Sequence, residues 1–168
     1  MALNIVLVEP EIPQNTGNIV RTCAALGAVL HLVHPLGYSL DEKHLKRAGL
    51  DYWPLLSIIE WNDSTTFFEH MEGEALYYFT TKAKRSYTSV HYPEQTYLVF
   101  GKESAGLDEA LLADRPDRCV RIPMRGGIRS LNLSNSVAIA AYEWERQYTF
   151  EGLETEGNLH RLAYKEQS

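Results

Sequence analysis

Three short stretches of this 168-residue sequence place small polar or charged side chains directly after an apolar run. They are EPEIPQNTGNIVR (residues 9–21), FGKESAGL (residues 100–107) and RSLNLSNS (residues 129–136). Amides, hydroxyls and guanidinium groups bind anions and polar ligands, and glycines let a ligand approach the backbone closely. These stretches are therefore the candidates for a binding or catalytic site.

The first stretch carries two asparagines and an arginine at a three-residue spacing. On a helix, where each residue turns by about 100°, Asn18 and Arg21 point to nearly the same side. This helix follows the first predicted strand, so that side faces the edge of the sheet at which α/β proteins bind ligands. Asn15 could also cap the helix, and Arg21 could simply be solvated.

The second stretch places a charged pair between two glycines. Gly101 ends an apolar segment, Lys102 and Glu103 follow it, and Gly106 closes the turn. A glycine at the end of a strand lets a ligand approach the backbone closely. Neither GxGxxG nor GxxxxGK[ST] occurs, which argues against a dinucleotide or P-loop fingerprint. The alternative for Lys102 and Glu103 is an ordinary solvated turn.

The third stretch lies between an apolar segment and an Ala-rich helix. Ser130, Asn132 and Ser134 provide hydroxyl and amide groups close to the N-terminus of that helix. Backbone N–H groups at such a position favour an anion or a polar ligand. The alternative is a capped helix with polar decoration, in which Ser134 is the cap.

Alternating strands and helices are expected to position these residues. Strands are predicted over residues 3–9, 29–34, 55–61, 75–81, 96–101 and 119–124, and helices over residues 16–27, 41–49, 64–71, 108–115 and 133–147. The strands show little apolar–polar alternation, which is typical of a parallel sheet covered on both faces. The sequence therefore predicts an α/β fold with a mostly parallel sheet and helices on both faces. We expect one domain over residues 1–150 and a loose tail over residues 151–168.

Composition and charge narrow the functional class. The apolar content of 45% and the charged content of 23% are ordinary for a globular protein, and no apolar run approaches membrane-spanning length. The formal net charge of −6 argues against non-specific coating of nucleic acid. Cys23 and Cys119 lack CxxC spacing, so we expect two buried free thiols, no metal site and a cytoplasmic protein.

Cations nevertheless gather in three places along this acidic chain. The clusters are Lys43, Lys46 and Arg47, then Lys82, Lys84 and Arg85, then Arg121, Arg125 and Arg129. Such clusters could guide a phosphate backbone to one place, although a run of charges is more often a solvated face.

Taken in order, these stretches resemble the SPOUT class of RNA methyltransferases, and within it the TrmL (YibK-like) group of tRNA wobble-position ribose 2′-O-methyltransferases. The matching segments are EPEIPQNTGNIVRTCAALG, KRAGLDYW, TTK, FGKESAGL and RIPM…RSLNLSNSVAIAAYE. Each segment alone is weak evidence. The ordered set, which spans most of residues 3–146, is highly specific.

The resemblance implies a fold and a cofactor that the residue pattern does not predict. It implies a deep trefoil knot near the C-terminus, in which S-adenosylmethionine lies bent and is held largely by backbone groups. The implied cofactor contacts are Phe79, Thr80, Gly101, Ile122, Ser130 and Leu131. It also implies a homodimer that shares the site across its interface. The stripe Val137, Ala141 and Trp144 is a candidate dimer face or, alternatively, part of the core.

The implied reaction methylates the ribose 2′-hydroxyl of the wobble nucleotide, a cytidine, a modified uridine or both, and releases S-adenosylhomocysteine. We assign catalysis to Arg21, with Asn15, Glu103, Ser130 and Asn132 around it. A guanidinium does not readily release a proton. Our hypothesis is therefore that Arg21 grips the adjacent phosphate and stabilises negative charge on the oxygen, while a phosphate oxygen or water accepts the proton.

The implied partner is tRNA. We expect phosphate contacts from Arg129, Lys46, Lys82, Lys84 and Arg85, and Tyr142 or Trp144 could stack on a base unless they belong to the core. Two other functions stay open. One is a noncatalytic RNA-binding protein on the same scaffold. The other is an rRNA ribose 2′-O-methyltransferase, which commonly carries an additional N-terminal RNA-binding domain; we expect none here because the first strand starts at Leu3.

Overall fold

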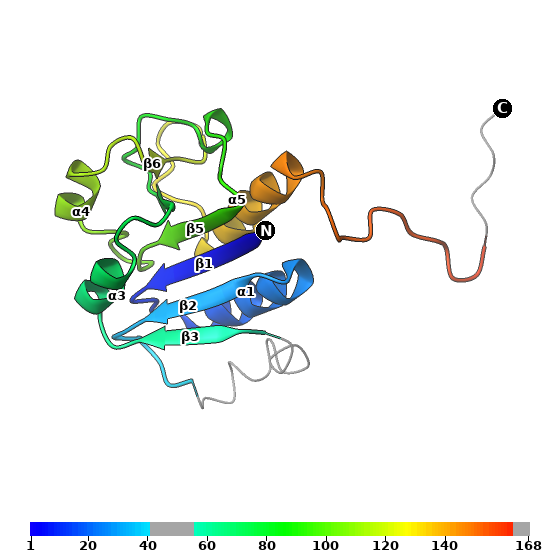
Figure 1. Cartoon of the computed structure of the whole chain (residues 1–168), viewed down its shortest axis with the longest axis horizontal. Helices are drawn as coiled ribbons and strands as arrows, with labels where there is room; N and C mark the ends of the chain where they lie inside the picture. The colour runs from blue at the N-terminus through cyan, green and yellow to red at the C-terminus, as the bar shows by residue number, and fades with distance from the viewer. Residues whose placement is uncertain (41–55, 163–168) are drawn as a thin grey trace.

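A six-stranded parallel sheet forms the centre of the structure, a computed structural model that describes residues 1–40 and 56–162 (Figure 1). Its strands are β1 (Ala2–Val8), β2 (Val29–Val33), β3 (Ile58–Trp61), β4 (Leu76–Phe79), β5 (Gln95–Phe100) and β6 (Cys119–Val120). They lie in the order β3-β2-β1-β5-β4-β6, and every neighbouring pair is parallel. The predicted parallel sheet is confirmed.

The last strand is shorter than the predicted span of residues 119–124. Beyond Val120 the chain makes a single parallel bridge between Arg121 and Ser86 and then leaves the sheet. Pro123 has no N–H group to give to a further ladder, which is why the apolar run does not continue as a strand.

The helices are α1 (Pro13–Leu26), α3 (Ser64–His70), α4 (Glu109–Ala113) and α5 (Leu133–Gln147), with a 3₁₀ turn, η2 (Tyr87–Ser89). α1 starts three residues before the predicted residue 16, because Pro13 fits the first helical position, where its missing N–H group is not needed. The helix predicted over residues 41–49, which includes Lys46, lies outside the described residues.

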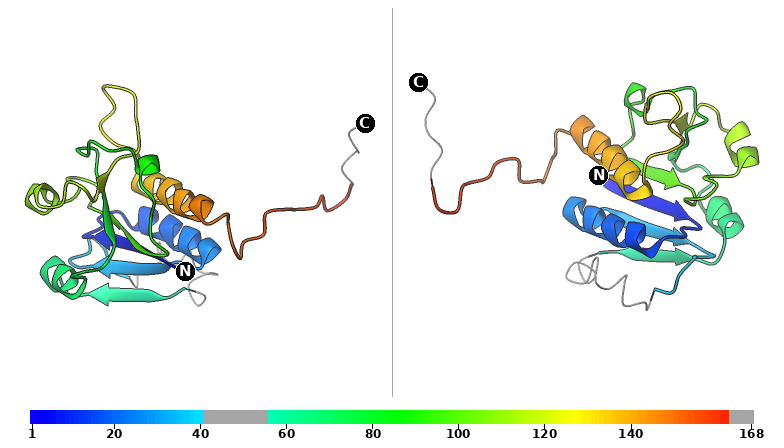
Figure 2. Two further views of the ribbon diagram at one scale, coloured as in Figure 1. Left: turned by 45° about the horizontal axis from the view of Figure 1, so that its top comes forward. Right: turned by 180° about the vertical axis from the view of Figure 1, so that it is seen from behind.

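Helices cover both faces of the sheet, as the sequence predicts. In β1, Ile5 and Leu7 pack with residues of α1 and α5, whereas Val6 between them packs with residues of α3 and α4. This period of two is what a strand buried on both faces requires. Seen from behind, α1 and α5 lie against the same face of the sheet (Figure 2).

The apolar stripe of α5 belongs to the core of the chain. Val137 and Ala141 are fully buried, Trp144 is 3% exposed, and the Trp144 indole donates a hydrogen bond to the Pro93 carbonyl at 3.0 Å. The alternative interpretation of this stripe as a dimer face is therefore wrong, since the chain itself covers it. Trp144 is unavailable for stacking on a base, whereas Tyr142 is 47% exposed.

The histidine and cysteine side chains of the core have structural roles. Trp61 Nε1 donates to His31 Nδ1 at 3.1 Å, and the opposite ring nitrogen, Nε2, lies 3.2 Å from the Asn4 amide oxygen. Burial lowers the pKa of His31 to about 4 and raises the pKa of Cys23 to about 12. Both cysteines are free and buried, as expected.

After α5 the chain leaves the body of the protein. Residues 154–162 are exposed, and the trace runs away from the sheet in every view (Figures 1 and 2). None of the helices in the described residues combines the length and apolar character that a bilayer crossing requires.

Candidate active site

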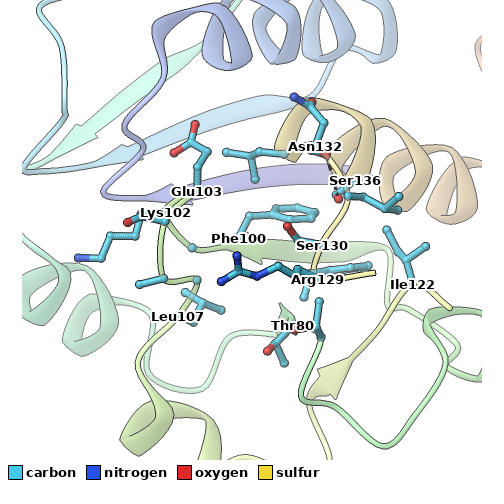
Figure 3. Close-up of a pocket in the computed structure, with 18 of the residues that line it drawn as sticks. Thr80, Phe100, Lys102, Glu103, Leu107, Ile122, Arg129, Ser130, Asn132 and Ser136 are labelled. Atoms are coloured by element: carbon cyan, nitrogen blue, oxygen red, sulfur yellow. Dashed lines mark hydrogen bonds between the residues drawn. The ribbon is translucent and has the colours of Figure 1, made fainter. Parts of the chain in front are cut away.

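A cavity of about 810 Å³ opens where the loops after β4, β5 and β6 meet the start of α1 (Figure 3). Phe79 and Phe100 are the last residues of β4 and β5, so the cavity lies at the carboxyl ends of the strands. This is the edge at which open α/β sheets bind ligands, and the volume is within the usual range of about 300–1,000 Å³ for small-molecule sites.

The three candidate stretches converge on this cavity. All six residues expected to contact the cofactor line it, together with four of the five expected to be catalytic and two of the expected RNA contacts. The lining thus includes Phe79, Thr80, Gly101, Ile122, Ser130, Leu131, Asn15, Glu103, Asn132, Lys82 and Arg129. The structure also describes three other candidate residues, which do not line the cavity: Arg21, Lys84 and Arg85.

One wall of the cavity is apolar. The rings of Phe79 and Phe100 stack at the ends of neighbouring strands, with centroids 4.8 Å apart and planes 20° from parallel. Leu107 and Ile122 extend this wall (Figure 3). A flat apolar ligand group that packs against this wall would bury apolar surface, which is favourable, and this wall would lose no hydrogen-bonded polar group in the process.

A second wall is backbone. The Gly106 N–H group donates to the Lys102 carbonyl at 2.8 Å, which folds the turn back over Gly101. A Cβ atom on Gly101 would lie 2.1 Å from the Gly106 carbonyl carbon, so only glycine fits. Gly106 itself has φ of +72°, a left-handed conformation that glycine adopts without strain. The sequence predicts that a ligand approaches the backbone at Gly101, but the group that lies this close is the protein's own backbone at Gly106.

Asn132, not Ser134, caps α5. The Asn132 Oδ1 atom accepts hydrogen bonds from the Ser134 N–H group at 2.9 Å, the Ser134 hydroxyl at 2.6 Å and the Asn135 N–H group at 3.3 Å. The interpretation of Ser134 as the cap is therefore wrong, because Ser134 already lies inside the first turn and is a donor to the true cap.

Asn15 joins the three stretches. Its Oδ1 atom accepts from Asn132 Nδ2 at 2.9 Å, and its own Nδ2 donates to Glu103 Oε1 at 3.0 Å. Asn15 is 5% exposed and is the third residue of α1, so its interpretation as the helix cap is wrong. The residue at the cap position is Ile12, whose side chain cannot accept a hydrogen bond.

Glu103, from a distant part of the chain, binds the segment that leads into α1. Its carboxylate accepts the Glu11 N–H group at 2.8 Å and the Ile12 N–H group at 3.2 Å, in addition to the Asn15 amide. The Ile12 N–H group is one of the donors that α1 leaves without an acceptor of its own, and a carboxylate near a helix N-terminus is favoured by the helix dipole. The interpretation of Glu103 as part of a solvated turn is therefore wrong.

Further side-chain contacts between the same two loops were missed by sequence reasoning. The Glu11 carboxylate accepts both the N–H group and the hydroxyl of Ser104, at 2.9 and 2.8 Å, and the Lys102 ammonium lies 2.8 Å from Glu9 Oε2. The hydrogen bonds from Ser104 lower the pKa of Glu11. Each partner lies more than ninety residues away in the sequence, so no local pattern indicates these contacts.

Arg21 lies outside the cavity on the exposed side of α1. It follows Asn15 by six residues, which corresponds to about 9 Å along the helix axis. Arg21 and Asn18 are both exposed and share one side of α1 as predicted, while the intervening Ile19 and Val20 are buried. The expectation that this side faces the ligand site is not met within the chain, because neither residue is among those that line the cavity.

The expected RNA-contacting cations are divided between the cavity and its surroundings. Lys82 and Arg129 line the cavity, and the Arg129 side chain projects over it (Figure 3). Lys82 pairs with Glu109 at 2.8 Å, and the Arg85 guanidinium donates to the Asp117 carbonyl at 2.7 Å. Lys84 and Arg85 are exposed on the neighbouring loop. Within the described ranges, no group of three His, Cys, Asp or Glu side chains is placed to hold a metal ion.

The fold is that of a methyltransferase family. The chain belongs to the SpoU rRNA methylase family, which it matches over residues 2–142.

Two relatives are similar to this chain over most of their length. The tRNA (cytidine(34)-2′-O)-methyltransferase of Escherichia coli K12 is 44% identical over 151 residues, which are 89% of this chain and 96% of that protein. A Geobacillus stearothermophilus protein that carries the same name provisionally is 49% identical over 156 residues, 91% of this chain and 99% of its own length.

Solved structures agree with the fold. A structure described as giving insight into the 2′-OH methylation of C/U34 on tRNA has a TM-score of 0.82 at 46% identity and covers 88% of this chain and 91% of that chain. The complex of AviRb from Streptomyces viridochromogenes with AdoMet has a TM-score of 0.78 at 24% identity, covering 88% of this chain and 58% of that one. At that identity the likeness shows the fold alone.

Proposed function

We propose that this protein transfers a methyl group from S-adenosylmethionine to the ribose 2′-hydroxyl of the wobble nucleotide, a cytidine or a modified uridine, in the tRNA anticodon loop. The observation that carries the proposal is the convergence of Gly101, Ile122 and Ser130 on one cavity at the carboxyl ends of the strands. The name of the Escherichia coli relative, which covers 89% of this chain, supports the same reaction.

The residues that line the cavity fit the proposed cofactor. The stacked rings of Phe79 and Phe100, with Ile122, offer an apolar wall suited to an adenine ring. The turn at Gly101 and the polar residue Ser130 suit the charged amino-acid end. When bound, S-adenosylmethionine would supply an activated methyl group that a ribose oxygen can take by in-line displacement, releasing S-adenosylhomocysteine and a proton.

The side chains of the chain itself would position the acceptor and stabilise charge. Asn15 and Asn132 hold the start of α1 and the start of α5 together through a 2.9 Å hydrogen bond. We infer that Arg21, exposed further along α1, grips the phosphate next to the target nucleotide and stabilises negative charge on the 2′-oxygen. A phosphate oxygen or water would accept the proton, since the guanidinium does not release one readily.

Two substitutions of Arg21 test this role. Arg21→Ala should lower kcat by roughly a hundredfold or more, in the range measured for other oxyanion-stabilising groups. Arg21→Lys should recover only a small part of that loss, because an ammonium cannot form the two parallel hydrogen bonds of a guanidinium. Near-full activity of Arg21→Lys in a steady-state methyl-transfer assay would contradict the phosphate clamp.

The tRNA would lie across the loops that border the cavity. We propose that Lys82, Lys84, Arg85 and Arg129 contact its phosphates, and that Lys46, outside the described residues, does the same. Exposure of Lys84 and Arg129 beside the cavity supports this placement.

We propose that the chain is knotted near its C-terminus. The connection from β4 to β5 is bonded to the C-terminal end of α5, since Gln147 Nε2 donates to the Val90 carbonyl at 2.9 Å and the hydroxyl of the following residue, Tyr148, donates to the Tyr92 carbonyl at 2.6 Å. Threading of α5 through that connection would enclose it in this way. A crystal structure in which residues 121–133 pass outside the connection would refute the knot.

We also propose a homodimer. The start of α1, the loop before α5 and the outer side of α5 expose the apolar side chains Ile12, Leu131, Ile139 and Tyr142, at 37–47%. A second copy that covers these residues would bring its own α1 and Arg21 near the cavity. Sedimentation of the purified protein at about the mass of one chain would contradict this.

The proposed functional unit is the segment of residues 1–150, with residues 151–168 as a tail. The family match ends at residue 142, and residues 154–162 are exposed, which supports this division. We place the protein in the cytoplasm, where tRNA is available and where two buried free cysteines stay reduced.

Methyl transfer by the purified protein tests the proposal. Incubation with labelled S-adenosylmethionine and bulk tRNA, followed by mass spectrometry of the nucleosides, should yield a 2′-O-methylated cytidine or uridine. Binding of tRNA without transfer would instead favour a noncatalytic RNA-binding protein. Methylation of rRNA but not of tRNA would favour an rRNA ribose 2′-O-methyltransferase.

A further inference from the structure

Glu11 connects the loop after β1 to the turn that forms the backbone wall of the cavity. Its carboxylate makes a two-point contact with Ser104, accepting the backbone N–H group at 2.9 Å on Oε2 and the hydroxyl at 2.8 Å on Oε1. Ser104 follows Glu103 directly and lines the cavity. Two hydrogen bonds to an ionised carboxylate are stronger than neutral ones and fix the direction of the turn.

The contact is reciprocal. While the Glu11 side chain accepts from Ser104, the Glu11 backbone N–H group donates to Glu103 Oε2 at 2.8 Å. The segments 11–12 and 103–104 therefore exchange hydrogen bonds in both directions. Neither segment can shift along the other without breaking bonds of both kinds.

The backbone of Glu11 also contacts the loop that contains Gly37. A Cβ atom on Gly37 would lie 2.7 Å from the Glu11 Cα atom, and the Gly37 N–H group donates to the Pro10 carbonyl at 2.9 Å. The backbone of Glu11 is thus packed against the loop after β2. A carboxylate on so fixed a backbone can determine where its partner turn lies.

We propose that Glu11 is a positioning residue for the methyl donor: its carboxylate holds the 101–106 turn in the shape that binds S-adenosylmethionine. This inference rests on the proposed function. Glu11 itself is not among the residues that line the cavity in the described structure, so it acts through Ser104 and Gly101 rather than by touching the cofactor.

Calorimetric titration of the full-length protein with S-adenosylmethionine tests the proposal. Glu11→Gln replaces one carboxylate oxygen, which accepts a hydrogen bond, by an NH₂ group that would face a donor of Ser104. The Kd for S-adenosylmethionine should therefore rise about tenfold, while the number of sites stays near one per chain. Ser104→Ala, which keeps its N–H group, should raise the Kd about threefold. The double variant should be no weaker than Glu11→Gln alone. Glu154→Gln, at an exposed position of the tail, is the matched control.

The outcomes separate three cases. A purely structural role would leave the Kd of the folded fraction unchanged while the number of sites falls, and this would overturn the proposal. An unchanged Kd and site number in Glu11→Gln, or additive effects in the double variant, would overturn it as well. Absence of binding by the unmodified protein would instead refute the proposed function and this inference with it.

Discussion

Gly101 lines the cavity at a point where an added side chain has no room. A Cβ atom there would lie 2.1 Å from the carbonyl carbon of Gly106 and 2.4 Å from the Leu107 nitrogen, both of which are backbone atoms. Gly101→Ala must therefore displace the turn. We expect a rise of at least tenfold in the Kd for S-adenosylmethionine and a loss of about 1–3 kcal/mol in the free energy of unfolding, as overpacking usually causes.

Gly126 provides the matched control for this substitution. An added Cβ would meet nothing within 4 Å there, and its φ is not left-handed. Gly126→Ala should leave both the Kd and the denaturant midpoint close to those of the unmodified protein. A Gly101→Ala variant with unchanged affinity would show that the backbone wall is not part of the binding site.

His31 makes the stability of the protein sensitive to acid. Burial lowers the pKa of His31 from 6.5 to about 4, so the unfolded chain binds a proton in this interval that the folded chain does not. The free energy of unfolding should be unaffected above about pH 6.5 and should fall as the pH drops towards 4, by at most about 1.4 kcal/mol per pH unit from this residue.

Urea titrations at several pH values measure this effect. His31→Gln keeps an acceptor for Trp61 and a donor for Asn4 but does not titrate, so its stability should depend less on pH between 4 and 6.5. Equal pH slopes in the two proteins would show that other groups cause the acid sensitivity.

At the scale of elements, α5 depends on its cap. Asn132 Oδ1 accepts three hydrogen bonds from Ser134 and Asn135, and Asn132 Nδ2 ties the helix to Asn15 on α1. Asn132→Ala should therefore lower the free energy of unfolding by roughly 1–2 kcal/mol, as the loss of a helix cap does. Thermal unfolding followed by circular dichroism measures this change.

Asn132→Ser separates the two roles of this residue. Serine can still cap α5, whereas it cannot reach Asn15 through an amide, so stability should be largely retained while methyl transfer falls. Asn135→Ala, at an exposed position in the same turn, is the control for helix propensity. Equal activity of Asn132→Ser and the unmodified protein would argue against the link to Asn15 in catalysis.

The elements could be predicted from the sequence because their signals are local. Short apolar runs with little alternation predicted the strands and their parallel pairing, and the strand from residue 29 was predicted to within one residue of β2 (Val29–Val33). At two of the element boundaries that differ from the prediction, a proline explains the difference. Pro13 begins α1 earlier than the Thr16 start expected, and Pro123 ends the apolar run that was taken as a longer β6.

The candidate site was predicted in its members but not in its contacts. The order of the motifs and the resemblance they carry predict that Gly101, Ile122 and Ser130 lie together, and in the structure all three line one cavity. The contacts at the start of α1 could not be predicted, because Glu103 makes them from 92 residues away in place of a local side chain. Likewise, nothing in the sequence near Glu11 points to Ser104 as its partner.

At the scale of the whole molecule, an acidic chain has to bind a polyanion through a local basic surface. The net charge is −6, yet Lys82, Lys84, Arg85 and Arg129 lie on or beside the cavity loops. Affinity for tRNA should therefore fall steeply with salt. Each substitution Lys84→Gln or Arg129→Gln should weaken binding and make the slope of log K against log salt concentration shallower by up to about 1.

Filter binding at several salt concentrations measures this slope. Arg161→Gln, an exposed cation of the tail, should leave it unchanged. A flat salt response of the unmodified protein would mean that phosphate contacts contribute little to recognition.

The central claim is that the acceptor is one ribose hydroxyl. Its most direct test is methyl transfer from labelled S-adenosylmethionine to two tRNAs that differ only in whether nucleotide 34, the position named for the Escherichia coli relative, carries a 2′-hydroxyl or a 2′-hydrogen. We expect incorporation approaching one methyl group per molecule of the ribose form and none into the deoxy form. Equal methylation of both, or of neither, would contradict it.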